Sequence, residues 1–354
     1  KRRGGDSMHL TYTEIFTQYA ALRNTYSYIL ENSRRIKDFF QHLRPRRWIF
    51  IGCGSGYNVC ESARVSAQLN LGIPANAIAA GDLLVNFDYY AGLLEESVII
   101  APSRSGGTSE VVAAVQKARG ASVPTLAISA KVGSPLAEAA ELSLELPWAF
   151  DESVCQTRTV TNFYVSNLML SAIVGENAEL LHEIECAIAE GDRFMAAYEG
   201  LAREVASAVW DRVVVLADAD LEGIAMEAAL VFTEISQAPA NHHHVLDVRH
   251  GPMVLIGENT LVVMAVSPRE TELQTNLIRD LRQRRAKVVT ISMGSQGNLG
   301  SDWEVHPADY QSFAVLGIPF IFIPQAIAYF RALERGIDPD RPGGLEPWID
   351  LGNS

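Results

Sequence analysis

Three hydroxyl residues and two glycines stand together in Ser103-Arg104-Ser105-Gly106-Gly107-Thr108, and these residue types suit the binding of a phosphate group. A phosphate dianion is held best by backbone N–H groups at a helix N-terminus, with hydroxyl groups as further donors. The next residues, 110–119, have helical character, and the glycines let the backbone approach a ligand closely. We therefore predict that Ser103, Ser105 and Thr108 donate to a phosphate. The alternative is that Thr108 only caps the helix.

Neither glycine-rich segment of the chain matches a nucleotide-binding motif. No Gly-Lys-Ser/Thr follows the hydroxyl segment, so it is not a P-loop. The segment Gly52-Cys53-Gly54-Ser55-Gly56 lacks the third glycine of a dinucleotide fingerprint, because Tyr57 or Val59 stands in its place. We therefore predict no nicotinamide cofactor, and no other cofactor.

The hydroxyl segment follows an apolar run, residues 97–102, and a strand is again expected at 123–128, which is a βαβ pattern. An earlier strand, turn and helix occupy 48–52, 53–56 and 57–71. The order recurs after roughly 165 residues, with strands at 213–216, 261–266 and 287–291 and helices at 222–234 and 272–284. This repetition predicts an α/β protein of two doubly wound, flavodoxin-like parallel-sheet domains related by internal duplication.

The predicted boundaries follow from these elements. We expect N-terminal helices in 1–40, a first domain with a helical connector in 41–200, a second domain in 201–328 and a C-terminal tail in 329–354. The two helices at the N-terminus fall within 11–40, and the connector spans 167–200. The apolar run 313–323 reads as a buried strand.

The composition limits the kinds of partner. The chain has 354 residues, 48% of them hydrophobic, and a net charge of -13, which disfavours a general attraction to nucleic acid or to an anionic membrane. The apolar runs are shorter than the roughly 20 residues of a membrane span. With Met8 read as the start and no apolar signal segment, we expect a cytoplasmic protein. The four cysteines, Cys53, Cys60, Cys155 and Cys186, are expected to be reduced core residues.

Both glycine-rich segments resemble the paired loops of the sugar isomerase (SIS) domain family. In the second half, Thr233-Glu234-Ile235-Ser236 and Asp247-Val248-Arg249-His250-Gly251-Pro252 look like the second SIS unit of the isomerase part of glucosamine-6-phosphate synthase and of related phosphosugar deglycases and deaminases. The resemblance covers nearly the whole chain from about Thr11.

This resemblance implies roles for individual residues. Ser55, Ser103, Ser105 and Thr108 match phosphate-binding positions, while Gly54, Cys155 and Thr157 match other substrate contacts. Arg104 either adds charge at the phosphate or is a surface residue beside the loop.

Two further residues match the catalytic pair of the family. Glu234 matches the general base, and His250 matches a histidine that assists ring opening and, in the family, reaches the neighbouring subunit's site. A homodimer or a dimer of dimers is implied. A carboxylate and an imidazole suit the proton transfers that such a reaction needs. Without the family, Glu234 would read as an ordinary solvated residue near a helix end.

The chain departs from the synthase pattern in ways that affect the predicted reaction. Val231 replaces a lysine of the synthase, the tail 341–348 lacks the lysine that caps the synthase site, and no glutaminase domain is expected. We therefore expect a deglycase that cleaves a fructosamine 6-phosphate. The alternatives are an amino-sugar 6-phosphate deaminase or isomerase and a non-catalytic sugar-phosphate sensor, although the first 40 residues leave little room for a helix-turn-helix.

The three consecutive histidines His242, His243 and His244 suggest a metal site, but consecutive residues in an extended segment point to alternate faces. We predict no metal and expect these histidines to line the site or the subunit interface. Asp247 and Arg249 are expected to form a structural pair or to contact the rim of the site.

Overall fold

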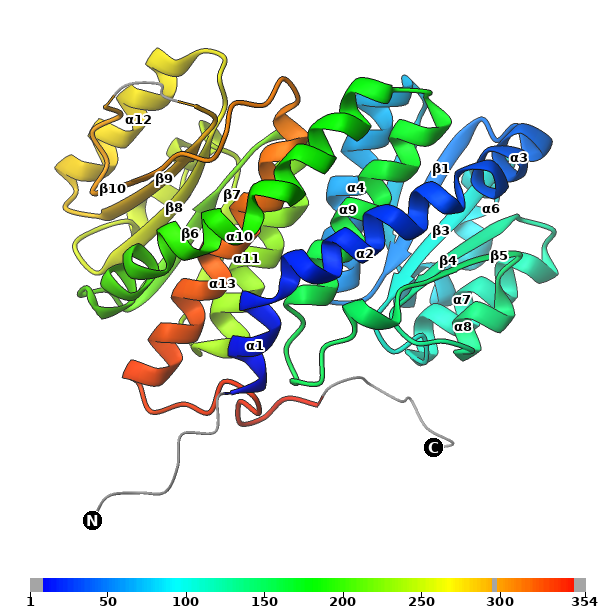
Figure 1. Cartoon of the computed structure of the whole chain (residues 1–354), viewed down its shortest axis with the longest axis horizontal. Coiled ribbons are helices and arrows are strands. Elements are labelled where there is room, and N and C mark those ends of the chain that lie inside the picture. The colour runs from blue at the N-terminus through cyan, green and yellow to red at the C-terminus, as the bar shows by residue number, and fades with distance from the viewer. Residues whose placement is uncertain (1–8, 295–297, 347–354) are drawn as a thin grey trace.

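The computed structural model describes residues 9–294 and 298–346. It contains two parallel five-stranded sheets, one in each half of the molecule, with helices packed between and around them (Figure 1). The first sheet has the order β2-β1-β3-β4-β5 and the second β10-β9-β8-β6-β7. Read in reverse, the second order is β7-β6-β8-β9-β10, which repeats the first order with every strand number raised by five. The predicted duplication of a doubly wound unit is therefore confirmed.

Strands are present at the predicted positions 48–52, 97–102, 123–128, 213–216, 261–266 and 287–291, whereas the strands at 75–79, 142–145, 240–243 and 303–305 were not predicted. The first sheet consists of β1 (Arg47–Gly52), β2 (Ala75–Ala79), β3 (Ser97–Ser103), β4 (Thr125–Ser129) and β5 (Leu142–Glu145). The second consists of β6 (Arg212–Leu216), β7 (Ala240–His243), β8 (Thr260–Val266), β9 (Lys287–Ser292) and β10 (Trp303–Val305). The central strands β3 and β8 are buried at every residue, which is why they read as continuous apolar runs.

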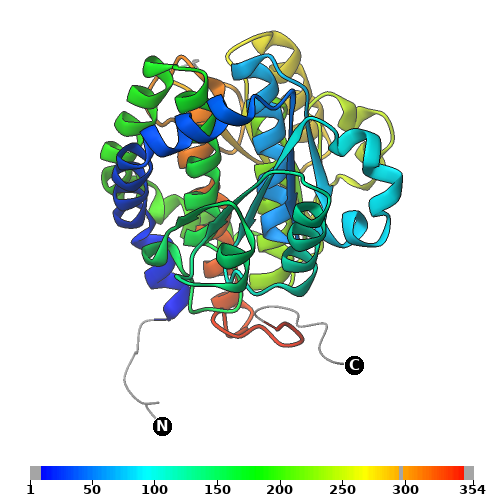
Figure 2. The same ribbon diagram turned by 90° about the vertical axis from the view of Figure 1, so that its right-hand side faces the viewer.

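The sheet of the first half is covered by helices on both faces, as Figure 2 shows. Successive side chains of a strand point to opposite faces. Ile49 and Ile51 therefore pack into a cluster with helices α5 and α7, while Trp48 and Phe50 pack into the large core that the two halves share. The helices of this half are α4 (Ser55–Leu71), α5 (Ala80–Val85), α6 (Ala91–Leu94), α7 (Ser109–Gly120) and α8 (Pro135–Ala139), with short 3-10 helices η1 (Phe87–Tyr90) and η2 (Pro147–Ala149).

The N-terminal segment and the connector are more divided than predicted. The two predicted N-terminal helices are three: α1 (Leu10–Phe16), α2 (Gln18–Glu31) and α3 (Ser33–Leu43). The connector consists of α9 (Arg158–Val174) and α10 (Ala178–Ser207), separated at residues 175–177. The second half adds α11 (Glu222–Ile235), α12 (Thr271–Gln283) and the 3-10 helices η3 (Ala219–Leu221), η4 (Asp247–Arg249) and η5 (Pro252–Leu255).

The predicted strand at 313–323 is wrong. This run forms the 3-10 helix η6 (Phe313–Leu316) and then α13 (Gly317–Glu334), whose residues are buried on nearly all sides. A helix that is apolar all round has no polar face, so its sequence cannot be told from a buried strand by periodicity. The segment Phe313–Glu334 is long and apolar enough to cross a membrane, but 94% of its apolar window is buried inside the protein. The helix also continues past Tyr329, where the tail was predicted to begin.

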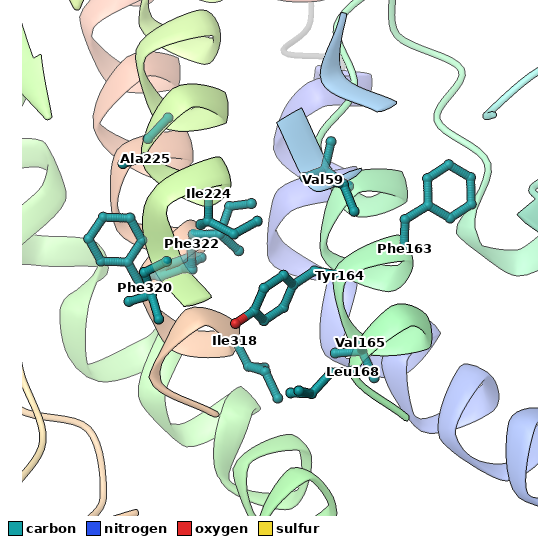
Figure 3. Packing of buried hydrophobic residues seen from close by; sticks show 14 of the residues in the cluster. Val59, Phe163, Tyr164, Val165, Leu168, Ile224, Ala225, Ile318, Phe320 and Phe322 are labelled. Carbon is teal, nitrogen blue, oxygen red and sulfur yellow. The ribbon is translucent and has the colours of Figure 1, made fainter. Parts of the chain in front are cut away.

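The halves meet through helices that approach unusually closely. Figure 3 shows Tyr164 of α9 reaching toward the start of α13, where its hydroxyl donates to the Ala314 carbonyl at 2.6 Å. A Cβ at Gly317 would lie 2.4 Å from the Tyr164 hydroxyl oxygen, and a Cβ at Gly223 of α11 would lie 2.1 Å from the Asn58 carbonyl oxygen of α4. These glycines let α4 and α9 of the first half contact α11 and α13 of the second, which brings α11 beside the loop that precedes α4.

Candidate active site

A cavity of about 400 Å³ lies where the first sheet reverses its strand order. The loops that follow β1 and β3 form one wall, at the carboxyl ends of two adjacent strands, where open α/β sheets bind ligands. The other walls come from the loop before α9, from α11 and from the chain after α13. The lining residues are Cys53, Gly54, Ser55, Gly56, Pro102, Ser103, Arg104, Ser105, Thr108, Glu110, Val111, Val154, Gln156, Glu234, Gly344, Leu345 and Glu346.

The loop between β3 and α7 has the predicted form of a phosphate site. The Ser103 and Ser105 hydroxyls accept from the backbone N–H groups of Gly106 and Gly107 at 3.2 and 3.1 Å, and each keeps its own hydrogen for donation. Gly106 has a φ of +57°, and a Cβ there would lie 2.1 Å from the Ser134 hydroxyl oxygen. Thr108 occupies the N-cap position of α7, but its side chain makes no capping hydrogen bond. Thr108 is therefore at the predicted cap position, but its hydroxyl does not make the capping hydrogen bond expected of a residue that only caps the helix.

Ser55, another predicted phosphate ligand, begins α4 and lines the cavity. Its side chain lies near the carboxyl of Glu227, a fully buried residue of α11. The Asn58 amide donates to Glu227 Oε2 at 2.9 Å, while Glu227 Oε1 has no hydrogen-bond partner among the described residues. Burial, together with the nearby Glu234 carboxyl, raises the pKa of Glu227 to about 8 against the opposing influence of Asn58 and Ser55. Glu227 was not predicted as a site residue.

Glu234, the predicted base, projects from the last turn of α11 into the cavity. Burial raises its pKa above the ordinary value, while a hydrogen bond from the Cys155 thiol and the charge of Arg104 lower it. A carboxylate in this setting is more basic than a solvated one, as proton abstraction from carbon requires. The reading of Glu234 as an ordinary solvated residue does not fit its position.

Arg104 is 4% exposed. The alternative prediction that it is a surface residue beside the loop is therefore wrong. Its Nη1 donates to the backbone carbonyls of Ser153 and Val154 at 2.9 and 3.0 Å. The guanidinium therefore lies beside the loop that precedes α9 and also lines the cavity.

Cys155 and Thr157, predicted to contact substrate, are buried and are absent from the cavity wall. Burial raises the pKa of the Cys155 thiol strongly, so the thiol stays protonated and donates to Glu234. Thr157 is the N-cap residue of α9, and its backbone N–H donates to buried Asp151 at 2.8 Å. Both residues support the wall, which at this point is formed by Val154 and Gln156.

His250 lies outside the cavity of its own chain. It follows η4 and is exposed, and the exposed apolar residues Val254 and Leu255 stand close to it in sequence. The structure therefore does not bring Glu234 and His250 together within one chain.

The three consecutive histidines do not line the cavity either. His242 and His243 belong to β7 at the edge of the second sheet, and His244 contacts Asp218 and Glu222 at 3.0 and 3.4 Å. In the described ranges 9–294 and 298–346, no three His, Cys, Asp or Glu side chains are grouped to hold a metal ion.

Two other expectations on single residues need correction. Arg249 pairs with Asp280 at 2.6 Å, not with Asp247. Cys186 is exposed on α10, whereas Cys60 and Cys155 are buried as expected.

The loop after β8, which corresponds to the β3–α7 loop, is filled by a side chain of its own half. After β8, the Gln274 side chain accepts from the Ser267 N–H at 2.9 Å and donates to the carbonyls of Ser267 and Arg269. The glutamine side chain therefore fills the polar interior of this loop, and no corresponding side chain from α7 is hydrogen-bonded to Ser103 or Ser105 in the described part of the first half.

Glu110, Gln156 and Glu346 also line the cavity and were missed by the sequence analysis. Glu110 lies two residues after Thr108 on the first turn of α7, so its position could have been inferred from the loop. Gln156 lies beside the predicted Cys155. Nothing in the sequence signals that Glu346, from the chain after α13, reaches this cavity.

Comparison with known proteins connects these features to a family. The SIS domain family matches residues 43–173 and 208–303, which are the two sheets with their helices. The glutamine–fructose-6-phosphate aminotransferases (isomerizing) of Aeropyrum pernix and Aquifex aeolicus are 27% and 25% identical over 97% and 98% of this chain. The chain spans only 57% and 58% of the length of these relatives.

Solved structures give the same assignment. A glucosamine-6-phosphate deaminase from Thermotoga maritima has a TM-score of 0.80 and 25% identity, covering 97% of this chain and 100% of that one. A tagatose-6-phosphate ketose/aldose isomerase from Escherichia coli has a TM-score of 0.83 and 22% identity, covering 99% and 100%, and shows the shared fold. Because the family model matches both sheets, the chain belongs to the SIS domain family.

Proposed function

We propose that this protein is an enzyme that converts an amine-bearing sugar phosphate by moving a proton between carbons 1 and 2. The observation that carries the proposal is the presence of Glu234 in the same cavity as the loop of Ser103, Ser105 and Thr108. The loop suits a phosphate because its hydroxyls and backbone donors face one site before a helix N-terminus. Glu234 suits proton abstraction because it is partly buried and its pKa is raised.

Two other lining residues suit the hydroxyl groups of a sugar. Glu110 and Gln156 each have one side-chain oxygen that is buried and has no hydrogen-bond partner among the described residues. A buried acceptor without a partner costs about 1–3 kcal/mol. Sugar hydroxyls or an ammonium group bound in the cavity would supply donors to these oxygens.

Within this proposal, the first candidate reaction is deglycation of a fructosamine 6-phosphate. Glu234 takes a proton from carbon 1 of the open ketosamine and returns it to carbon 2, while the N–H proton passes to the oxygen on carbon 2, which leaves an imine at carbon 1 and a hydroxyl on carbon 2. Water adds to the imine, and the carbon–nitrogen bond breaks to release an aldose 6-phosphate and an amine. Buried Val231 supports this candidate, since it cannot supply the amine that the resemblance to the synthase places there.

His250 is proposed to open the sugar ring in the cavity of a neighbouring copy. Its exposure outside its own cavity and the exposed Val254 and Leu255, 80% and 61% accessible, support a contact with another subunit. We therefore propose a homodimer in which each site uses Glu234 of one chain and His250 of the other.

The second candidate is an amino-sugar 6-phosphate deaminase or isomerase. The Thermotoga maritima structure supports it, because that protein is called a glucosamine-6-phosphate deaminase and aligns along its whole length. Both candidates need the same base and the same phosphate loop, and they differ in the position of the nitrogen on the substrate.

The deciding experiment is a mass-spectrometric incubation of the protein with a mixture of fructosamine 6-phosphates and amino-sugar 6-phosphates. A free amine together with an aldose 6-phosphate supports the deglycase. Ammonia or aldose–ketose exchange from the amino sugar supports the deaminase or isomerase. Glu234→Gln is expected to abolish either reaction, whereas the matched change Glu179→Gln on the exposed face of α10 should leave it unchanged. Thermal stabilisation by sugar phosphates without any turnover would contradict the enzyme proposal and favour a sensor.

A further inference from the structure

Arg104 is fixed in place by its surroundings. The guanidinium donates to the carbonyls of Ser153 and Val154 at 2.9 and 3.0 Å. The same turn is held from two other sides: Glu14 of α1 accepts from the Ser153 N–H at 3.1 Å, and the Val154 N–H donates to the Asp340 carbonyl at 3.0 Å. A charge held by this many contacts cannot swing freely toward a phosphate.

The turn that Arg104 holds leads directly to the proposed base. Cys155 follows Val154, and its thiol donates to the Glu234 carboxylate. Arg104 and Glu234 both line the cavity, and the charge of each acts on the other. Arg104 therefore acts on Glu234 both through space and through the position of Cys155.

The other charged groups near Glu234 are acidic. Glu227 lies two helical turns earlier on the same helix, and Glu110 and Glu346 line the same cavity from α7 and from the chain after α13. The carboxyls of Asp151 and Glu14 also interact electrostatically with Arg104. Among the described residues that line the cavity, Arg104 is the only cation. Carboxylates that share a site disfavour one another's ionisation, whereas a nearby cation favours it.

We propose that Arg104 is a positioning residue that provides a fixed counter-charge for Glu234. The inference rests on the proposed function of Glu234 as the base. An arginine suits this task because its planar group holds two backbone carbonyls while its charge remains in place at every physiological pH. The phosphate is then held by the hydroxyls and backbone of the loop, without a formal contribution from Arg104.

The test compares Arg104→Gln and Arg104→Lys with the wild-type protein. In Arg104→Gln the acid limb of the kcat/KM profile is expected to move up by about one pH unit, because the lost cation lets the pKa of Glu234 rise. In Arg104→Lys the charge remains, so the acid limb should stay within a few tenths of a unit even if the melting temperature falls. If Arg104→Gln does not fold, the lysine variant decides: a shift of a whole unit there would overturn the proposal.

A second measurement separates this proposal from the proposed reaction. The Glu234 side-chain carboxyl can be titrated by 13C NMR in protein labelled at glutamate, with Glu234→Gln identifying its signal. An upward shift of the Glu234 pKa in Arg104→Gln supports the counter-charge even if no substrate turns over, in which case only the reaction has failed. An unchanged Glu234 titration, with a more than tenfold weaker affinity for inorganic phosphate, would show that Arg104 is a phosphate ligand instead.

Discussion

Two carboxyl groups on one helix face define the chemistry of this site at the scale of single residues. Glu227 and Glu234 are seven residues apart on α11, which places them on the same face two turns apart. Glu227 is fully buried, and its carboxyl meets Ser55 and Asn58 of α4. Its pKa of about 8 means that it is mostly protonated at neutral pH, so it can donate a hydrogen bond while Glu234 acts as the base.

This burial predicts a pH-dependent stability. The pKa of Glu227 is higher in the folded state than its ordinary value of 4.5, so its ionisation destabilises the fold as the pH rises from about 4.5 to about 8. Glu227→Gln, which stays neutral, is expected to match the wild-type stability near pH 5 and to exceed it at pH 9, by on the order of 2–4 kcal/mol in the free energy of unfolding. Melting curves of both proteins across this range measure the difference.

Because Glu14 and Glu234 also have raised pKa values, both proteins should lose stability with pH, and only the difference between them reports on Glu227. If the stabilities of the two proteins changed with pH in parallel, ionisation of Glu227 would not destabilise the folded state, and the prediction would be wrong.

At the scale of elements, the crossing of α4 and α11 decides whether the base reaches the phosphate loop. The Ser62 hydroxyl accepts from the Ile224 N–H at 3.0 Å, and the Ser66 hydroxyl donates to Asp220 at 2.7 Å, so polar contacts run along the crossing. Gly223 permits the close approach, since a Cβ there would lie 2.1 Å from a backbone oxygen and 2.4 Å from a backbone nitrogen of α4. Backbone atoms cannot move aside as a flexible side chain can.

Gly223→Ala is therefore expected to destabilise the protein by about 3 kcal/mol through overpacking, and to lower turnover by displacing Glu234 from the loop. Gly200→Ala is the matched control, because Gly200 also lies in a helix but has no atom within 4 Å of the added Cβ. That control should be neutral or slightly stabilising, since alanine favours a helix more than glycine does. Chemical denaturation measures the stability of the two variants, and an activity assay measures their turnover. Equal stability and equal turnover in both variants would contradict the prediction.

At the scale of the whole molecule, the site needs elements from both halves and, in our proposal, from a second copy. The N-terminal helices and the C-terminal segment also contribute: Asp340 accepts from the N–H groups of Leu10 and Thr11 at 3.0 and 2.8 Å. After this anchor the chain, red in Figure 1, reaches the cavity at Gly344, Leu345 and Glu346. The first and last parts of the chain thus hold one wall of the site.

A mixing experiment tests the proposed exchange of His250 between copies. Glu234→Gln and His250→Ala are each expected to be inactive alone. If the two are unfolded and refolded together at equal concentration, about half of the dimers are mixed, and each mixed dimer has one intact site. About a quarter of the wild-type activity should return. No recovery, with dimers present by light scattering, would place the partner of Glu234 within its own chain.

Several features of this protein follow from local sequence. Apolar runs between glycine-rich turns located the three central strands of each sheet, because strands buried on both faces must be apolar throughout, whereas the edge strands were not predicted. The run of Ser103, Ser105 and Thr108 predicts a phosphate loop, because its residue types carry the donors. The repeated order of elements predicted the duplicated doubly wound fold.

Other features depended on contacts between residues far apart in the chain. The helix α13 was read as a strand in part because only its burial by both halves explains a helix without a polar face. Glu227 lies near Ser55 only because the glycine at the α4–α11 crossing lets the two helices approach, and Arg104 is bonded to the 153–154 turn only because that turn lies against it. Residue type and spacing determined the fold and predicted the phosphate loop, whereas the tertiary packing decided which charges face one another, since burial and proximity set the pKa values on which the proposed chemistry depends.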